Sequence, residues 1–208
     1  KLIKYSIDEE EVTGYTKTVD GYNIKNSYTP EVVNIAGEKT WNDNDDQDGK
    51  RPESIKVTLY KTVNGVKSKV EEKDVTKANG WKYEFENLPK YEKGKEIKYS
   101  IEEDSVAGYV GSLDGYNLTN THTPEKVNVA GEKTWEDKDN QDGKRPTKIK
   151  VKLLKQVENE TPIVVETKEV SKGTDGKWKY EFKDLPKYEK GKLIKYSIDE
   201  EEVTGYTK

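Results

Sequence analysis

The sequence predicts an all-β protein made of tandem immunoglobulin-like β-sandwich modules. Apolar and polar residues alternate in short runs, as in Ile97–Glu103, and alternation with a period of two is typical of a half-buried strand. Asn-Gly and Asp-Gly dipeptides stand between several of these runs, where hairpin turns need residues that tolerate a positive φ. The pattern then repeats after about a hundred residues, which is near the size of one domain.

Seven strands are predicted in the middle of the chain. In order, they are Val33–Trp41, Ile55–Tyr60, Lys69–Val75, Trp81–Leu88, Ile97–Glu103, Tyr109–Leu113 and Tyr116–Thr121. The second, fourth and fifth of these alternate most clearly, and the other four complete the set. Turns are expected at Asn64-Gly65, Asn79-Gly80 and Asp114-Gly115. Because no stretch has helical periodicity, we expect an immunoglobulin-like sandwich or a closely related topology.

Repeated sequence motifs define the expected domains. Residues 1–17, KLIKYSIDEEEVTGYTK, recur letter for letter at 192–208. Three further words occur twice: GEKTW from Gly37 and Gly131, QDGKRP from Gln47 and Gln141, and LPKYEKGK from Leu88 and Leu185. Such self-similarity indicates a window from a longer tandem array. We expect the C-terminal part of one module in residues 1–30, a complete module in 31–124, and the N-terminal and middle part of a further module in 125–208.

The composition narrows the class of protein. Charged residues make up 38% of the chain, but 14 Tyr and 4 Trp favour folding over disorder. Lys and Arg (37) nearly balance Asp and Glu (41), so nothing favours nucleic acid or an anionic membrane as a partner. There is no Cys, hence no disulfide or thiolate metal site. A module with so small an apolar core needs another form of reinforcement, and no cofactor is predicted.

Strand alternation directs three polar side chains at the predicted core. Lys39 shares the face of Trp41, Glu103 shares the face of Ile101, and Asn120 lies on the apolar face of the last strand. Lysine and glutamate are almost never fully buried unless they are paired. We therefore expect Lys39, Glu103 and Asn120 to meet inside the module.

Buried together, these groups have a specific chemistry. Burial should shift the pKa values of Lys39 and Glu103 toward the neutral forms. A neutral amine is a nucleophile, and a protonated carboxyl polarises an amide and shuttles protons. Attack of Lys39 on the Asn120 amide would expel ammonia and leave an isopeptide cross-link, with Glu103 as the acid and base. The bond would tie the first strand to the last.

The words that surround these residues carry a family resemblance. GEKTW, QDGKRP, WKYEFENLPKY, IKYSIEE and GYNLTNT resemble Cna-B-type repeats, the stalk modules of Gram-positive collagen adhesins and pilins. The resemblance implies a sandwich with a spontaneous Lys–Asn isopeptide bond promoted by an acidic residue. The lysine of GEKTW is Lys39, the second acid of YSIEE is Glu103, and the last asparagine of YNLTN is Asn120. Glu103 is preferred to Glu102 because only Glu103 shares the core face.

The two partial modules each lack one half of this set. The first contains Glu9 and Asn26 without a lysine strand, and the last contains Lys133 and Glu200 without an asparagine strand. Either both remain incomplete, or Asn26 of one copy pairs with Lys133 of the same or another copy. Such pairing would make the two copies of YSIDE compete for one strand position.

Three other motifs are given structural interpretations. Asn44-x-Asp46-x-Asp48-Gly49 resembles the start of an EF-hand loop, but position twelve is Ile55 rather than Glu. An exposed turn rich in Asn and Asp is expected instead, and no metal site is predicted. The acidic run Asp8–Glu11 is expected to be a solvated edge. The single His122 has no ligand or nucleophile partner in the sequence and is expected on the surface.

The predicted function is structural. Tandem cross-linked modules would form a stiff stalk of a cell-wall-anchored, extracellular adhesin of a Gram-positive bacterium, whose partners are neighbouring repeats. Host matrix would bind through other domains. The alternative is a module that itself binds a ligand in the host extracellular matrix through exposed tyrosines and acidic loops. A turnover enzyme is not predicted, because the cross-linking chemistry runs once per molecule and has no external substrate.

Overall fold

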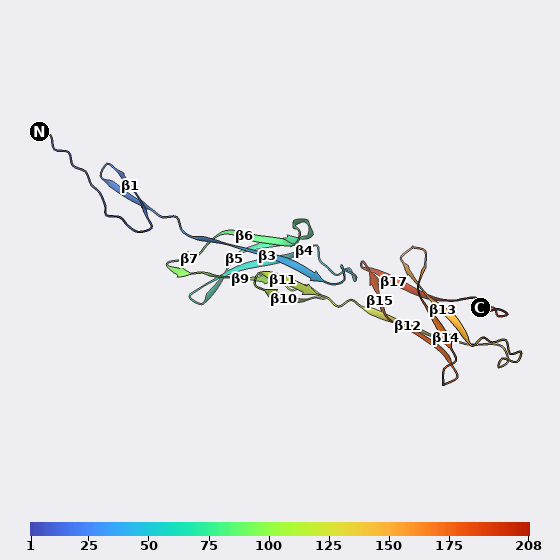
Figure 1. Cartoon of the computed structure of the whole chain (residues 1–208). Helices are drawn as coiled ribbons and strands as arrows, with labels where there is room; N and C mark the ends of the chain where they lie inside the picture. The colour runs from blue at the N-terminus through green and yellow to red at the C-terminus, as the bar shows by residue number, and fades with distance from the viewer. The chain divides into compact units, whose positions relative to one another are not determined.

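The computed structural model describes residues 1–208 and is built from strands, with a single short 3-10 turn (Figure 1). Two compact units divide the chain. The first comprises Lys1–Glu38 with Ser54–Asp104, and the second Lys39–Glu53 with Ser105–Lys208. No helix has the length and apolar character needed to cross a bilayer. The all-β prediction is confirmed.

The first unit holds the core of the central repeat. Strands β5 (Val66–Thr76), β4 (Ser54–Val63) and β9 (Lys98–Glu103) form one antiparallel sheet in that order. The first part of β3 (Val32–Asn42) pairs with β6 (Lys82–Pro89), and a small ribbon joins β7 (Tyr91–Glu92) to β8 (Lys95–Glu96). The buried apolar residues are Ile35, Ile55, Val57, Leu59, Val75, Tyr83, Phe85, Leu88, Ile97 and Ile101.

The first unit also includes the N-terminal segment. Strands β1 (Thr16–Asp20) and β2 (Asn23–Ser27) form a hairpin in which every residue is exposed. The preceding residues 1–12 are in no strand. This segment therefore contributes nothing to the buried core of its unit.

The second unit contains the C-terminal repeat. Strand β12 (Lys126–Lys133) pairs with β15 (Trp178–Pro186), and a second sheet has the order β14 (Ile163–Ser171), β13 (Lys148–Val157), β17 (Lys192–Glu200), β16 (Tyr188–Glu189). A single core cluster forms from the inward residues of both sheets. Its buried members are Ile149, Val151, Leu153, Val170, Trp178 and Phe182.

The last strands of the central repeat also belong to the second unit. Strands β10 (Val110–Asp114) and β11 (Asn117–Thr121) form a hairpin, and β11 runs parallel to the end of β3, with Leu118 opposite Lys39 and Asn120 opposite Trp41. The first and last strands of the repeat are therefore direct neighbours.

The predicted strands all form, with one turn predicted wrongly. Asn64 and Gly65 have φ of 48° and 79° and make the expected hairpin between β4 and β5. Asn79-Gly80 makes no hairpin, because Lys77–Asn79 is a 3-10 turn closed by Gly80 in the left-handed conformation. The reason is topological: β6 pairs with β3 rather than folding back onto β5.

Candidate functional site

Lys39 and Asn120 are both buried polar residues on neighbouring strands. Only 2% of Lys39 and 1% of Asn120 is exposed. Because residues two apart share a face, Lys39 and Trp41 on β3 lie on the same face as their partners Leu118 and Asn120 on β11. The structure thus places these two predicted site residues on one buried surface.

The strand register sets the spacing between this lysine and asparagine. Asn120 lies one strand across and two residues along from Lys39. With strands about 4.8 Å apart and a rise of about 3.3 Å per residue, their Cα atoms are about 8 Å apart. Diagonal pairs at this separation are within reach of long side chains. The Lys39 Nζ lies 4.7 Å from the centroid of the Trp41 ring, so the chain of the lysine extends along the strand toward the asparagine.

In the C-terminal repeat, the corresponding lysine is paired with a carboxylate. Lys133 Nζ lies 2.9 Å from Glu200 Oε2, and the two side chains are 19% and 13% exposed. Lys133 also lies over Trp135, 4.7 Å from the ring centroid, as Lys39 does over Trp41. Glu200 Oε1 is buried and accepts no hydrogen bond. The pair therefore leaves one carboxylate oxygen available for a further donor.

Glu103 occupies the same place in its repeat as Glu200. Each ends its strand opposite a buried valine, Glu103 opposite Val57 and Glu200 opposite Val151. Burial, followed by the negative charge of Glu103, raises the pKa of Tyr83 to about 12. The charge of Glu103 therefore acts on the buried phenol of Tyr83 within the first unit.

The equivalents in the N-terminal segment are held differently. Asn26 lies opposite Lys17 in the β1–β2 hairpin, as Asn120 lies opposite Gly111, but Asn26 is exposed. Glu9 is half-buried and belongs to no strand. Asn26 and Lys133 belong to different units, so their pairing stays a prediction.

A second polar cluster was not predicted. Asp43 is buried and binds Arg51 through two bonds, Nη2 to Oδ1 at 2.6 Å and Nε to Oδ2 at 3.0 Å. Tyr109 donates its hydroxyl to Asp43 Oδ2 at 2.8 Å. Burial would raise the pKa of Asp43, but the bonds from Arg51, the Asp46 N–H and Tyr109 outweigh it and lower the pKa to about 2.

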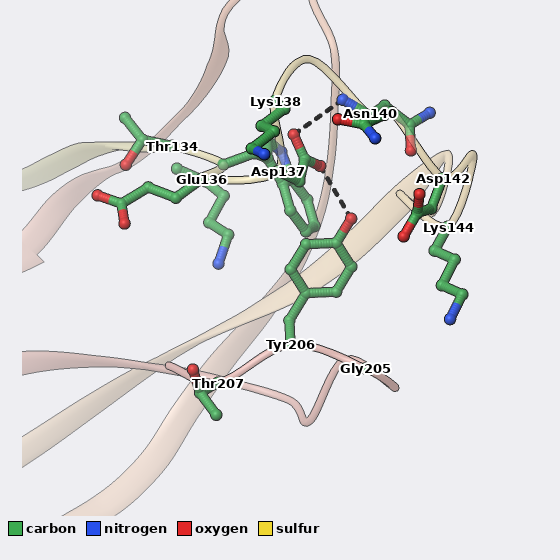
Figure 2. Close-up of a pocket in the computed structure, with 13 residues that line it drawn as sticks. Thr134, Glu136, Asp137, Lys138, Asn140, Asp142, Lys144, Gly205, Tyr206 and Thr207 are labelled. Atoms are coloured by element: carbon green, nitrogen blue, oxygen red, sulfur yellow. Dashed lines mark hydrogen bonds between the residues drawn. The ribbon is translucent and has the colours of Figure 1, made fainter.

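The same cluster recurs in the C-terminal repeat. Asp137 binds Arg145 at 2.5 and 2.9 Å. It also accepts the Tyr206 hydroxyl at 2.8 Å, as Figure 2 shows. The Arg145 bonds lower the pKa of Asp137 well below its usual range. Repetition of QDGKRP in the sequence pointed to this loop, but nothing in the sequence paired its arginine with the aspartate and the distant tyrosine.

Two further acids of the loop also bind protein groups. Asp46 accepts the Arg51 N–H at 2.9 Å, and Asp48 accepts the Glu125 N–H at 2.8 Å. Three successive residues, Asn44 to Asp46, have positive φ. The loop is therefore a turn stabilised by Asp side chains, as expected, although Asp43 and Asp48 are buried rather than exposed.

The prediction for His122 was wrong. Its side chain is 8% exposed, with Nε2 2.8 Å from Asp48 Oδ2 and Nδ1 2.7 Å from the Gly108 carbonyl oxygen. One partner, Asp48, lies far away in the sequence, and the other is the backbone carbonyl of Gly108. Strand periodicity predicts neither contact.

An open cleft borders the C-terminal lysine. It has a volume of about 660 Å³ and is lined by Lys133, Asp137, Lys144 and Tyr206 among other, mostly polar residues (Figure 2). Lys133 is thus reachable from solvent, whereas Lys39 is buried.

Comparison with known proteins gives consistent matches over nearly the whole chain. Residues 1–27, 35–121 and 129–208 match the family model described as Cna protein B-type domain. A collagen adhesin of Staphylococcus aureus is 42% identical over 213 residues, covering 100% of this chain and 17% of the relative. The chain therefore spans 17% of the length of this curated relative.

Solved structures of related repeats are also similar. The crystal structure of two B repeat units of the collagen binding protein of Staphylococcus aureus matches with a TM-score of 0.72 and 42% identity, over 99% of this chain and 54% of that one. A single B repeat unit of the same protein matches at 40% identity with a TM-score of 0.41, over 85% of this chain and 90% of that one.

Proposed function

Because the chain belongs to the family of Cna protein B-type domains, we propose that its central repeat joins Lys39 to Asn120 by an isopeptide bond. The neutral Lys39 amine attacks the side-chain carbonyl carbon of Asn120. A C–N bond forms, and the bond to the amide nitrogen breaks. The proton lost by the amine passes through the Glu103 carboxyl to the leaving group, so that one ammonia is released. The reaction happens once and consumes no external substrate.

The observation that carries this proposal is the burial of Lys39 and Asn120 on adjacent parallel strands. Taking a charged ammonium out of water is costly, and a cross-link removes its charge. The Lys133–Glu200 pair supports the role of the acid, because it places a carboxylate against the equivalent lysine where no asparagine strand is paired with β12. By equivalence, Glu103 supplies this carboxylate to Lys39.

The proposed role of the repeats is mechanical. A bond between the first and last strands prevents the repeat from unzipping when its two ends are pulled apart. We propose that such repeats form a stiff stalk of a surface protein of a Gram-positive bacterium, anchored in the cell wall. Collagen binding is stated of the relatives as whole proteins, of which this chain matches 17% in one case. We therefore propose that ligand binding belongs to other domains.

The mass of the denatured chain tests the cross-link. We expect it to be lower than the mass calculated from the sequence by one ammonia. Lys39→Ala and Asn120→Ala should restore the calculated mass, and Glu103→Gln should restore it in most molecules because proton transfer is lost. Lys133→Ala is the matched control and should retain the deficit. A deficit that persists in Lys39→Ala would overturn the assignment.

Pairing of Asn26 with Lys133 remains a separate proposal. It is supported by Glu200 Oε1, which is buried without a donor, as an incoming asparagine amide would supply one. Closure predicts a second ammonia lost from the mass, abolished by Asn26→Ala or Lys133→Ala. Closure between copies would also give covalent dimers on a denaturing gel. A loss of only one ammonia, with no dimers, contradicts the pairing.

The alternative, binding of host matrix by the repeat itself, has a direct test. Immobilised collagen should retain this chain if the alternative is right, and charge reversal in the Asp43–Arg51 loop should release it. The stalk proposal predicts no retention of the 208-residue chain.

A further inference from the structure

We infer that the loop Gln47–Pro52 of one repeat and the turn Tyr188–Lys192 of the next are the two halves of a repeat-to-repeat joint. The joint partner of each repeat is then another copy of the same repeat. This inference deepens the proposed stalk and rests on it for its purpose, but its geometry is independent of the cross-link. The contacts between the two halves all lie within the second unit.

The joint begins with contact between two backbones. Gly191 donates its N–H to the Gln47 carbonyl at 3.0 Å. A Cβ added to Gly49 would lie 2.4 Å from the Cα of Gly191, and one added to Gly191 would lie 3.0 Å from the Cα of Gly49. Side chains cannot be accommodated at this distance, so both positions need glycine for the contact as well as for their positive φ.

The linker between the repeats is held from both sides of the joint. The side chain of Asp48 is fully buried. It accepts hydrogen bonds from the Glu125 N–H and from the His122 ring, each at 2.8 Å. The Glu125 carboxylate in turn binds Lys50 at 3.1 Å and Lys187 at 2.7 Å. One acidic residue of the linker thus bridges a lysine of the preceding loop and a lysine beside the following turn.

Each half of the joint forms without its partner. In the first unit, Lys90 donates its backbone N–H to the Glu31 carbonyl at 3.0 Å and its Nζ to Glu31 Oε2 at 2.7 Å, as Lys187 does to Glu125. Gly94, the equivalent of Gly191, has a φ of 74° and open space around it. The turn therefore adopts its conformation without contact with the loop of a preceding repeat.

The loop half is likewise preformed in the C-terminal repeat. Gly143 has a φ of 66°, against 65° for Gly49, and open space around its Cα. Figure 2 shows Asp142 and Lys144, the equivalents of Asp48 and Lys50, on the same loop. The turn with Gly94 thus fits the loop of a preceding repeat, and the loop with Gly143 fits the turn of a following one. This accounts for the repetition of both QDGKRP and YEKGK.

Matched glycine substitutions test the joint. The chain has no native Cys, so Val110→Cys and Lys183→Cys provide two unique sites for spin labels, one on each side of the linker. We expect a narrow distribution of label distances in the otherwise unchanged chain and in Gly143→Ala. Gly49→Ala carries the same backbone strain as Gly143→Ala. It should nevertheless lose the narrow peak, because the methyl group added at residue 49 clashes with Gly191, whereas the one added at residue 143 meets open space.

A second pair of variants covers the case in which Gly49→Ala fails to fold. Asp48→Asn weakens the hydrogen bonds that Asp48 accepts from His122 and Glu125 of the linker, without adding volume. Asp142→Asn is its control. Broadening in Asp48→Asn alone supports the joint. Identical distributions in Gly49→Ala and Gly143→Ala, or a broad distribution in the unchanged chain, overturn it. The ammonia deficit reports the cross-link alone, so failure of the joint and failure of the proposed cross-link are distinguishable.

Discussion

Both ring nitrogens of His122 face oxygen acceptors. Nε2 lies 2.8 Å from an Asp48 carboxylate oxygen, and Nδ1 lies 2.7 Å from the Gly108 carbonyl. A neutral imidazole donates from only one nitrogen, so the imidazolium is the form that satisfies both bonds. The bond to Asp48 is the main cause that raises the pKa of His122; the Gly108 bond adds to it, while burial and the charge of Lys50 oppose it. The ring of Tyr109 packs beside it, with centroids 5.4 Å apart.

This raised pKa predicts that the joint weakens as the pH rises. The group's contribution to stability is fully present below its unfolded pKa of about 6.5 and is lost as the pH passes through the higher folded-state pKa. Because the chain has one histidine, an NMR titration of the imidazole protons reads the pKa directly. His122→Tyr copies Tyr28 at the equivalent position and should remove the pH dependence of the label distances. A titration midpoint at or below the ordinary value contradicts the prediction.

Residues on strands were easier to predict than residues in loops. Alternation identified Lys39 and Asn120 as inward-facing, because the face of a strand follows from counting along it. It gave no information on Asp43 or His122, whose partners come from other loops and from the backbone. The burial of such groups depends on which loops meet, and that is decided by the tertiary structure.

At the scale of the element, one sequence of seventeen residues adopts two structures. In residues 192–208 it provides strand β17, and Ile194 is 7% exposed; in residues 1–17 it forms no strand in its first part, and Ile3 is 69% exposed. Local contacts are the same in both copies: Lys17 binds Asp8 as Lys208 binds Asp199. The strand therefore depends on pairing with β13. The turn that follows it forms in both copies and does not depend on that pairing.

Truncation of the equivalent isoleucines should therefore have unequal effects. We expect Ile194→Ala to lower the free energy of unfolding by about 2–5 kcal/mol, because it leaves a cavity in a packed core. Ile3→Ala is the matched control, and as an exposed position it should change the free energy by less than about 0.5 kcal/mol. Urea unfolding followed by tryptophan fluorescence measures both. Equal costs would show that the N-terminal copy also occupies a strand site.

The turn at Asn79-Gly80 shows the limit of local signals in predicting elements. Its residues suit a hairpin, and Gly80 has the expected left-handed conformation. The direction of the chain after the turn is set by the pairing of β6 with β3, which the dipeptide does not encode. Fold class and strand positions follow from periodicity, whereas strand order does not.

On the scale of the whole molecule, the repeated words fall into two sets. GEKTW and YSIDE/YSIEE place the lysine and the acid of the proposed cross-link, and QDGKRP and YEKGK provide the loop and turn of the proposed joint. Repetition alone marks both sets as important without assigning either a role. The contact between Gly49 and Gly191 joins words from different repeats, so the sequence of a single repeat cannot reveal it.

The parallel pairing of β3 with β11 has a consequence for damaged chains. If the proposed bond joins Lys39 to Asn120 across this pair, the polypeptide between the two residues forms a closed covalent ring. Tension applied to the ends of the repeat then passes from Lys39 directly to Asn120. A protease that cuts the ring once, for example at the Asn64-Gly65 turn between β4 and β5, leaves the two ends connected. A filament of such repeats would tolerate one cut in each ring without breaking.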